Sequence, residues 1–144
     1  MAIKQISVFL ENRPGTLEAM TGVLAAARVD MRALSVAETK DFGIVRVIVK
    51  DVYETATVLK DAGYICSMTP VVAVMIPDEV GGLSKVLSTL GKVDVNVEYM
   101  YASLAGKVSG SAYMIIRVED IEKAEASLLA GGFTLATQDA ISEM

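Results

Sequence analysis

Histidine is absent from this sequence of 144 residues. It is the side chain that most often acts as a general acid or base near neutral pH, and it is the most common metal ligand in proteins. Its absence argues against serine-triad hydrolysis, Cys-His catalysis and most zinc sites. The sequence therefore indicates a protein that catalyses no reaction and carries no metal or other cofactor.

Cysteine occurs once, as Cys66, so no disulfide can form within the chain, and a reducing compartment is indicated. Its neighbours Ile65 and Ser67 carry no charge, which favours a small buried side chain over a reactive thiol. The first ten residues lack an apolar run of signal-peptide length. We expect a cytoplasmic protein.

Positive charge is in deficit, with 13 Lys and Arg against 18 Asp and Glu and a net charge of −5. This balance would repel nucleic acids and anionic membrane surfaces, and the basic residues are scattered rather than gathered on one face. The longest uncharged stretch, residues 62–77, is interrupted by Gly63 and Pro70 and is too short to span a membrane. Neither a nucleic acid nor a membrane is expected as a partner.

Hydrophobic residues are plentiful at 53%, enough for a packed core. The length suits one ordinary domain or two small ones of about 70 residues. An internal repeat favours two, because like residues recur at a constant offset: Val8 with Val74, Gly15 with Gly81, Leu17 with Leu83, Leu24 with Leu90 and Val29 with Val95. Beyond an expected hairpin loop at residues 105–110 the offset lengthens slightly: Val49 with Val118, Asp51 with Asp120, Leu59 with Leu128 and Gly63 with Gly132. We predict tandem domains at residues 1–69 and 70–144.

In both halves the spacing of hydrophobic residues changes between strand-like and helix-like in the same order along the sequence. In the first half, strands are predicted at residues 3–10, 31–38, 44–49 and 64–69, and helices at 16–28 and 52–62. In the second half, strands are predicted at residues 71–76, 95–102, 112–118 and 133–137, and helices at 83–92 and 121–130. Asp41, Phe42 and Gly43 are expected to form a hairpin tip. The order βαββαβ predicts an α+β protein with two ferredoxin-like domains in tandem, each an antiparallel sheet with both helices on one face.

The best candidate for a ligand site is the segment between the first strand and the first helix, residues 11–17. Unpaired N–H groups at a helix start, together with the helix dipole, can hold a carboxylate. Pro14 sets the turn, and Gly15 lacks the Cβ that would keep a ligand away from the backbone. The equivalent segment of the second half is residues 77–82.

An amino acid also carries an ammonium group, and two pairs of equivalent positions could accept its hydrogen bonds. Asn12 is equivalent to Asp78, and Asp30 to Asn96, so each half has one amide and one carboxylate at these positions. We expect the strand that follows the first helix to approach the first loop and bring the two groups together. The alternative is that Asn12 and Asp78 cap helices while Asp30 and Asn96 form turns.

The candidate ligand-binding residues are Leu10, Asn12, Arg13, Pro14, Gly15, Thr16, Asp30, Met31, Asp78, Val80, Gly81, Gly82 and Asn96.

The run of residues 6–17, followed after the helix by Val29, Asp30 and Met31, resembles the ACT domain family. It is similar to the serine-binding regulatory domain of bacterial phosphoglycerate dehydrogenases and to the small regulatory subunit of acetohydroxyacid synthase. The resemblance covers the whole chain as fold and repeat, while the specific motif lies in the first half. It implies allosteric amino-acid binding at the interface of paired ACT domains, with the positions of Asn12 and Asp30 contacting the effector.

Three departures from the serine-binding relatives bear on the ligand. Those relatives place a histidine where Leu10 stands, and usually an asparagine at the position of Asp30. Leu10 therefore argues for a ligand that is more apolar than serine or differently charged. Val80 replaces Pro14 in the second half, where an altered or lost site is expected.

The leading hypothesis is a homodimeric sensor of a free amino acid or a related small ligand, because exposed edge strands need covering. The alternative is a regulatory subunit that acts in trans on an enzyme partner. A third hypothesis is an acylphosphatase-like hydrolase, for which Arg13 and Asn12 would supply a crude phosphate site.

Overall fold

The computed structural model describes residues 2–103 and 111–143, so the expected loop at residues 105–110 lies outside the described residues. The chain forms two compact units. We call Lys4–Thr69 the first unit, and Pro70–Met144 together with Met1–Ile3 the second unit.

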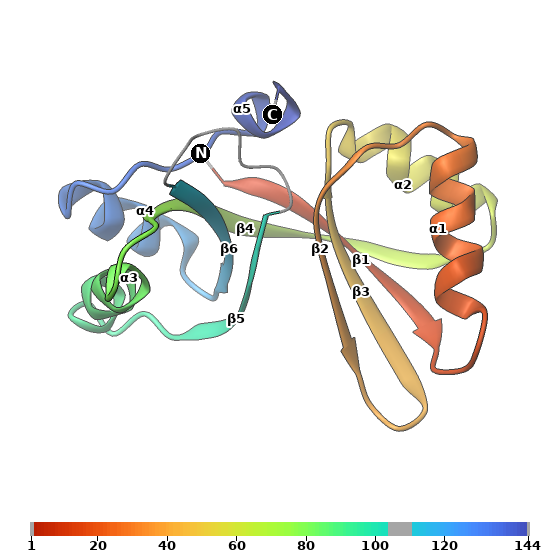
Figure 1. The fold of residues 1–144 in the computed structure, drawn as a ribbon, viewed down its shortest axis with the longest axis horizontal. Coiled ribbons are helices and arrows are strands. Elements are labelled where there is room, and N and C mark those ends of the chain that lie inside the picture. The colour runs from red at the N-terminus through yellow and green to blue at the C-terminus, as the bar shows by residue number, and fades with distance from the viewer. Residues whose placement is uncertain (1, 104–110, 144) are drawn as a thin grey trace. The chain divides into compact units, whose positions relative to one another are not determined.

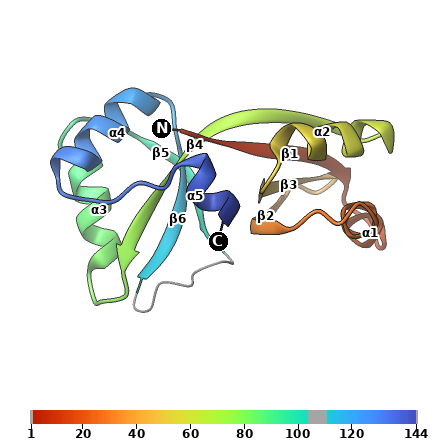
Figure 2. The same ribbon diagram turned by 90° about the horizontal axis from the view of Figure 1, so that it is seen from above.

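The first unit contains β1 (Ile3–Glu11) from Lys4 onward, α1 (Thr16–Ala26), β2 (Met31–Glu38), β3 (Phe42–Val49), α2 (Val52–Asp61) and the start of β4 (Ile65–Pro77). Its strand order is β2-β3-β1-β4, and β3 pairs antiparallel with both β1 and β2. Helices α1 and α2 lie on the same face of this sheet (Figure 1 and Figure 2). Alternate residues of β1 and β3 pack against them and form one core: Ile6, Val8, Leu10, Met20, Leu24, Val45, Val47, Val49, Val52, Ala56 and Leu59.

The second unit contains the rest of β4, α3 (Gly82–Gly91), β5 (Val97–Ala102), β6 (Ser111–Val118), α4 (Ile121–Ala130) and α5 (Gln138–Glu143). Its strand order is β4-β6-β5, with antiparallel pairing throughout. Its core repeats that of the first unit: Val72, Val74, Ile76, Val86, Leu90, Val95, Ile116, Val118, Ala124 and Leu128.

The second helix of each unit begins in the same way. Asp51 caps α2 by accepting the N–H of Glu54 at 3.0 Å, and Asp120 caps α4 by accepting the N–H of Lys123 at 3.1 Å. Each cap satisfies an amide that has no partner within its own helix. The predicted tandem of ferredoxin-like units is confirmed.

Two expectations about the strands of the first half were wrong. Phe42 and Gly43 do not form a hairpin tip, because they begin β3 and pair with Glu11 and Leu10 of β1. The predicted strands 64–69 and 71–76 are not separated at Pro70, since β4 runs through it. Proline fits an extended strand because its φ is compatible and only one amide donor is lost.

The last predicted strand, residues 133–137, is reduced to one isolated bridge between Val74 and Leu135. The chain then turns into α5, which was not predicted. The hydroxyl of Thr137 accepts the N–H of Ala140 at 3.1 Å at the start of this helix. A capping threonine thus starts a short helix directly after the predicted strand.

Candidate ligand-binding site

The entrance to α1 is shaped by Gly15 and Thr16. Gly15 is the N-cap residue, with φ 86° and ψ −13°, and no side chain caps the helix in the described part of the chain. The Thr16 hydroxyl donates into the loop, lying 2.8 Å from the carbonyl oxygen of Glu11 and 3.0 Å from that of Arg13. The first turn of α1 therefore differs from that of α2, because it is open to an acceptor from outside the chain.

The backbone conformation of Gly15 gives a reason for glycine at this position that the sequence did not show. A Cβ built on it would meet nothing within 4 Å, so the position is not crowded. Its positive φ is the constraint, because this left-handed conformation strains any residue with a Cβ. Pro14 beside it is exposed, as expected for a turn residue.

Asn12 connects the loop before α1 to the hairpin between β2 and β3 by hydrogen bonds. Its amide group donates to the Glu38 carboxylate at 3.0 Å and to the Thr39 carbonyl at 3.2 Å. Its backbone N–H donates to the carbonyl of Asp41 at 3.1 Å. This side chain positions the loop, a role that neither the ligand-binding nor the capping interpretation included.

Asp30 lies far from Asn12 within the first unit. Glu11, next to Asn12, pairs with Phe42 at one end of β3, whereas Met31, next to Asp30, pairs with Val49 at the other end. A strand of eight residues spans roughly 24 Å. The expectation that Asp30 approaches the loop of its own half was wrong. The reason is that β1 and β2 run in the same direction, so the end of one is remote from the start of the other.

At that far end, Asp30 forms an ion pair with Arg32, with 3.1 Å between Oδ2 and Nη2. Met31 is half-buried and packs against the core of the first unit. Neither side chain contributes to the loop of the same unit.

The loop before α3 has the same glycine turn but a tighter closure. Gly81 has φ 83°, and a Cβ on Gly82 would lie 2.6 Å from the carbonyl oxygen of Pro77. Glu79 forms an ion pair with Lys85 of α3 at 2.9 Å. The close approach of the backbone at Gly82 leaves no space for a side chain at this point.

Asp78 and Asn96 repeat the separation seen in the first unit. Pro77, beside Asp78, pairs with Ser111 at the start of β6, while Val97, beside Asn96, pairs with Val118 at its end. Val80 is fully exposed in the loop. The expected meeting of Asp78 and Asn96 does not occur within the second unit.

A cavity of about 460 Å³ lies beside the loop of the first unit. It brings together three predicted residues, Leu10, Arg13 and Thr16. Glu11 of the predicted loop segment lines it as well, and sequence reasoning missed the other main contributors: Phe9, Phe42, Tyr64 and Ile65. Tyr64 and Ile65 follow α2 and reach the end of β1 because β4 is the neighbour of β1. The predicted ferredoxin-like fold was the signal that could have identified them.

Charge is paired at the border of this cavity. The Arg13 Nε lies 3.0 Å from the Glu11 Oε2, and both side chains are about two-thirds exposed. An exposed pair of this kind is weak and is readily rearranged. Its guanidinium and carboxylate are complementary to the carboxylate and ammonium of an amino acid.

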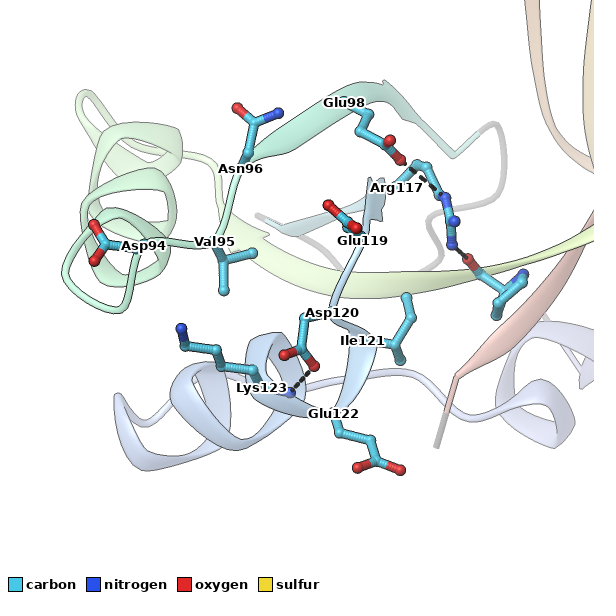
Figure 3. A pocket seen from close by; sticks show the side chains of 11 residues that line it. Asp94, Val95, Asn96, Glu98, Arg117, Glu119, Asp120, Ile121, Glu122 and Lys123 are labelled. Atoms are coloured by element: carbon cyan, nitrogen blue, oxygen red, sulfur yellow. Dashed lines mark hydrogen bonds and ion pairs between the residues drawn. The ribbon is translucent and has the colours of Figure 1, made fainter.

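Asn96 lies instead in a second cavity, of about 640 Å³, in the second unit (Figure 3). Arg117 donates to the Pro70 carbonyl at 2.9 Å and pairs with Glu98 at 3.1 Å. Further carboxylates line this cavity, including that of Glu119. Its acidic lining is suited to cations and differs from that of the first cavity.

Within the described residues, no three His, Cys, Asp or Glu side chains are grouped so that they could hold a metal ion. In the same part of the chain, no helix is long and apolar enough to cross a membrane.

Two ferredoxin-like units, βαββαβ in the first and βαββα with a single added bridge in the second, each have a glycine-turned entrance to their first helix and define a tandem ferredoxin-like protein. The chain belongs to the family of ACT domain pairs, which it matches over residues 1–144. A search of curated proteins found no match.

Solved structures show the same fold. Protein BT0572 from Bacteroides thetaiotaomicron is 35% identical with a TM-score of 0.92, and the match covers 100% of this chain and 98% of that chain. The ligand-free regulatory subunit of aspartate kinase from Thermus thermophilus is 16% identical with a TM-score of 0.65, covering 89% and 91%. The regulatory subunit from Thermus flavus is 17% identical with a TM-score of 0.65, covering 90% of each chain.

Proposed function

We propose that this protein is a regulatory protein that binds a free amino acid at the loop between β1 and α1. The observation that carries the proposal is the entrance to α1, which has no side-chain cap and adjoins a cavity bordered by Glu11 and Arg13. Helix amides and Arg13 would receive the carboxylate, and Glu11 would receive the ammonium group. Membership of the ACT family supports this type of ligand.

The regulated enzyme could be a separate protein that this chain binds in trans. The regulatory subunits of aspartate kinase from Thermus thermophilus and Thermus flavus have this fold. We further propose that the free protein is a homodimer. Light scattering of the purified protein tests the dimer, and affinity purification at native expression level tests for a co-purifying enzyme.

An acylphosphatase-like activity has less support. Its two required groups are engaged elsewhere, because Arg13 pairs with Glu11 and the Asn12 amide binds Glu38 and Thr39. An assay with acetyl phosphate would detect the activity directly.

The proposal is tested by thermal unfolding with each of the twenty amino acids. A ligand at free concentration L that binds only the folded state stabilises it by RT ln(1 + L/Kd), so the unfolding midpoint rises with the logarithm of the ligand concentration above Kd. Arg13→Gln should weaken the affinity for the active amino acid at least tenfold, which is about 1.4 kcal/mol.

Lys85→Gln is the matched control, because it also breaks an exposed ion pair at the start of a unit's first helix. We expect it to leave the affinity unchanged. A response that Lys85→Gln removes and Arg13→Gln preserves would assign the ligand to the other loop.

A further inference from the structure

The cavity beside the first loop has an unusual border of large apolar side chains. Phe9, Phe42 and Ile65 are 44%, 61% and 73% exposed, and all three line it. Single exposed apolar residues are common, but several gathered at the edge of one cavity mark a binding site.

The positions of these side chains follow from the alternation of the strands. Leu10 belongs to the core beneath the helices and is 8% exposed, and half-buried Tyr64 packs against the same core. Phe9 and Phe42 belong to the opposite face, since Phe9 alternates with Leu10, and Phe42 pairs with Glu11. The cavity therefore reaches around the end of the sheet, with apolar groups from both faces.

The charged groups are confined to one part of this cavity. Glu11 and Arg13 lie within 3.0 Å of each other, and the other main contributors are aromatic or aliphatic. A ligand whose charges met this pair would extend its side chain over apolar surface. A small polar side chain would leave that surface in water and gain little, because burial of apolar area is the main source of affinity here.

We infer that the effector is an amino acid with a large apolar side chain, aromatic or aliphatic. The inference rests on the proposed function and adds the ligand's chemical class. A volume of about 460 Å³ accommodates a ligand of this size with room for ordered water.

The test is calorimetric titration of the full chain with phenylalanine, leucine, serine, aspartate and lysine. Phenylalanine or leucine should bind at least tenfold more tightly than the other three. Phe42→Ala should weaken that binding at least tenfold, and Phe42→Leu should restore most of it, because an apolar contact is regained.

Tyr53→Ala is the matched control. Tyr53 is 63% exposed, close to the value for Phe42, but it lies on α2 and outside the cavity. We expect this variant to bind as the unaltered protein does. Equal losses in Phe42→Ala and Tyr53→Ala would show a general effect on the fold and would overturn the assignment.

The other outcomes separate this inference from the proposed function. Tight binding of serine, aspartate or lysine that Arg13→Gln weakens would leave the proposed function standing and overturn the apolar class. Absence of binding by any of the twenty amino acids would overturn both. If Phe42→Ala changed the oligomeric state in solution and left the affinity unchanged, the inference would be overturned too. The apolar border would then be a contact between copies of the chain.

Discussion

The loops that lead into α1 and α3 have the same glycine turn but close it differently. Thr16 reaches the Glu11 carbonyl with its hydroxyl at 2.8 Å. Gly82 occupies the equivalent position, where a Cβ would lie 2.6 Å from the equivalent carbonyl of Pro77. One loop is closed by a side-chain hydrogen bond and the other by close backbone approach. A repeated turn can thus be preserved while the side chains around it diverge.

The divergence also affects charge. In the first loop Glu11 and Arg13 pair with each other beside a cavity, whereas Glu79 of the second loop pairs with Lys85 on the helix. The first arrangement leaves two opposite charges beside a space for a ligand. The second connects the loop to α3. We therefore expect the first unit to carry the ligand site.

The largest expected effects test whether the two cores are equivalent. Leu24 and Leu90 occupy equivalent helix positions, and each is 1% exposed. Replacement of either by alanine should lower the free energy of unfolding by about 2–5 kcal/mol, through lost apolar burial and a residual cavity. Urea denaturation measures both values. A loss below about 1 kcal/mol at either site would mean that its core can collapse around the gap.

A smaller effect is expected where the second loop is most crowded. Gly82→Ala should lower the free energy of unfolding by about 3 kcal/mol, because the backbone of Pro77 must move to admit the Cβ. Gly91→Ala is the control in the same helix, since a Cβ there meets nothing within 4 Å. We expect it to be neutral or to stabilise by up to about 1 kcal/mol. Similar losses in both variants would contradict the close-approach explanation.

The smallest effect is expected at the equivalent position of the first loop. Thr16→Ala removes the hydroxyl that donates to the loop carbonyls and should cost about 1 kcal/mol of folding free energy. Thr57→Ala is the control, because its hydroxyl bonds to the Tyr53 carbonyl within α2. That change should lie within about 0.5 kcal/mol of zero or be stabilising, since alanine favours the helix. Thermal unfolding of both variants shows whether the loop hydrogen bond contributes.

Local chemistry predicted the element order and the helix starts. Helices were predicted directly after Asp51 and Asp120, and the structure has both helices, each capped by that aspartate. These signals are readable because a cap and an amphipathic stripe depend on residues within one or two turns. The end of the second unit was not predicted in this way, because residues 133–137 form only one bridge and the short helix capped by Thr137 was missed.

The binding loop was predicted, but its partners were not. Asn12 and Asp30 were predicted to bind one ligand together because their side chains suit an ammonium group. The strand register places them at opposite ends of β3. Phe42 was assigned to a hairpin tip, although it pairs with Glu11 and lines the cavity. Register is set by contacts between strands that are distant in sequence, so neither relation is visible in a local pattern.

The amino-acid order alone established the duplication, the βαββαβ order of the first half and the glycine-turned helix entrances, because each depends on neighbouring residues and on hydrophobic period. Only the tertiary structure shows that Phe9, Arg13, Phe42 and Tyr64 line one cavity and that Asp30 lies away from it. The cavity lining depends on the pairing of β1 with both β3 and β4, because strand neighbours determine which loops lie at the same end of the sheet.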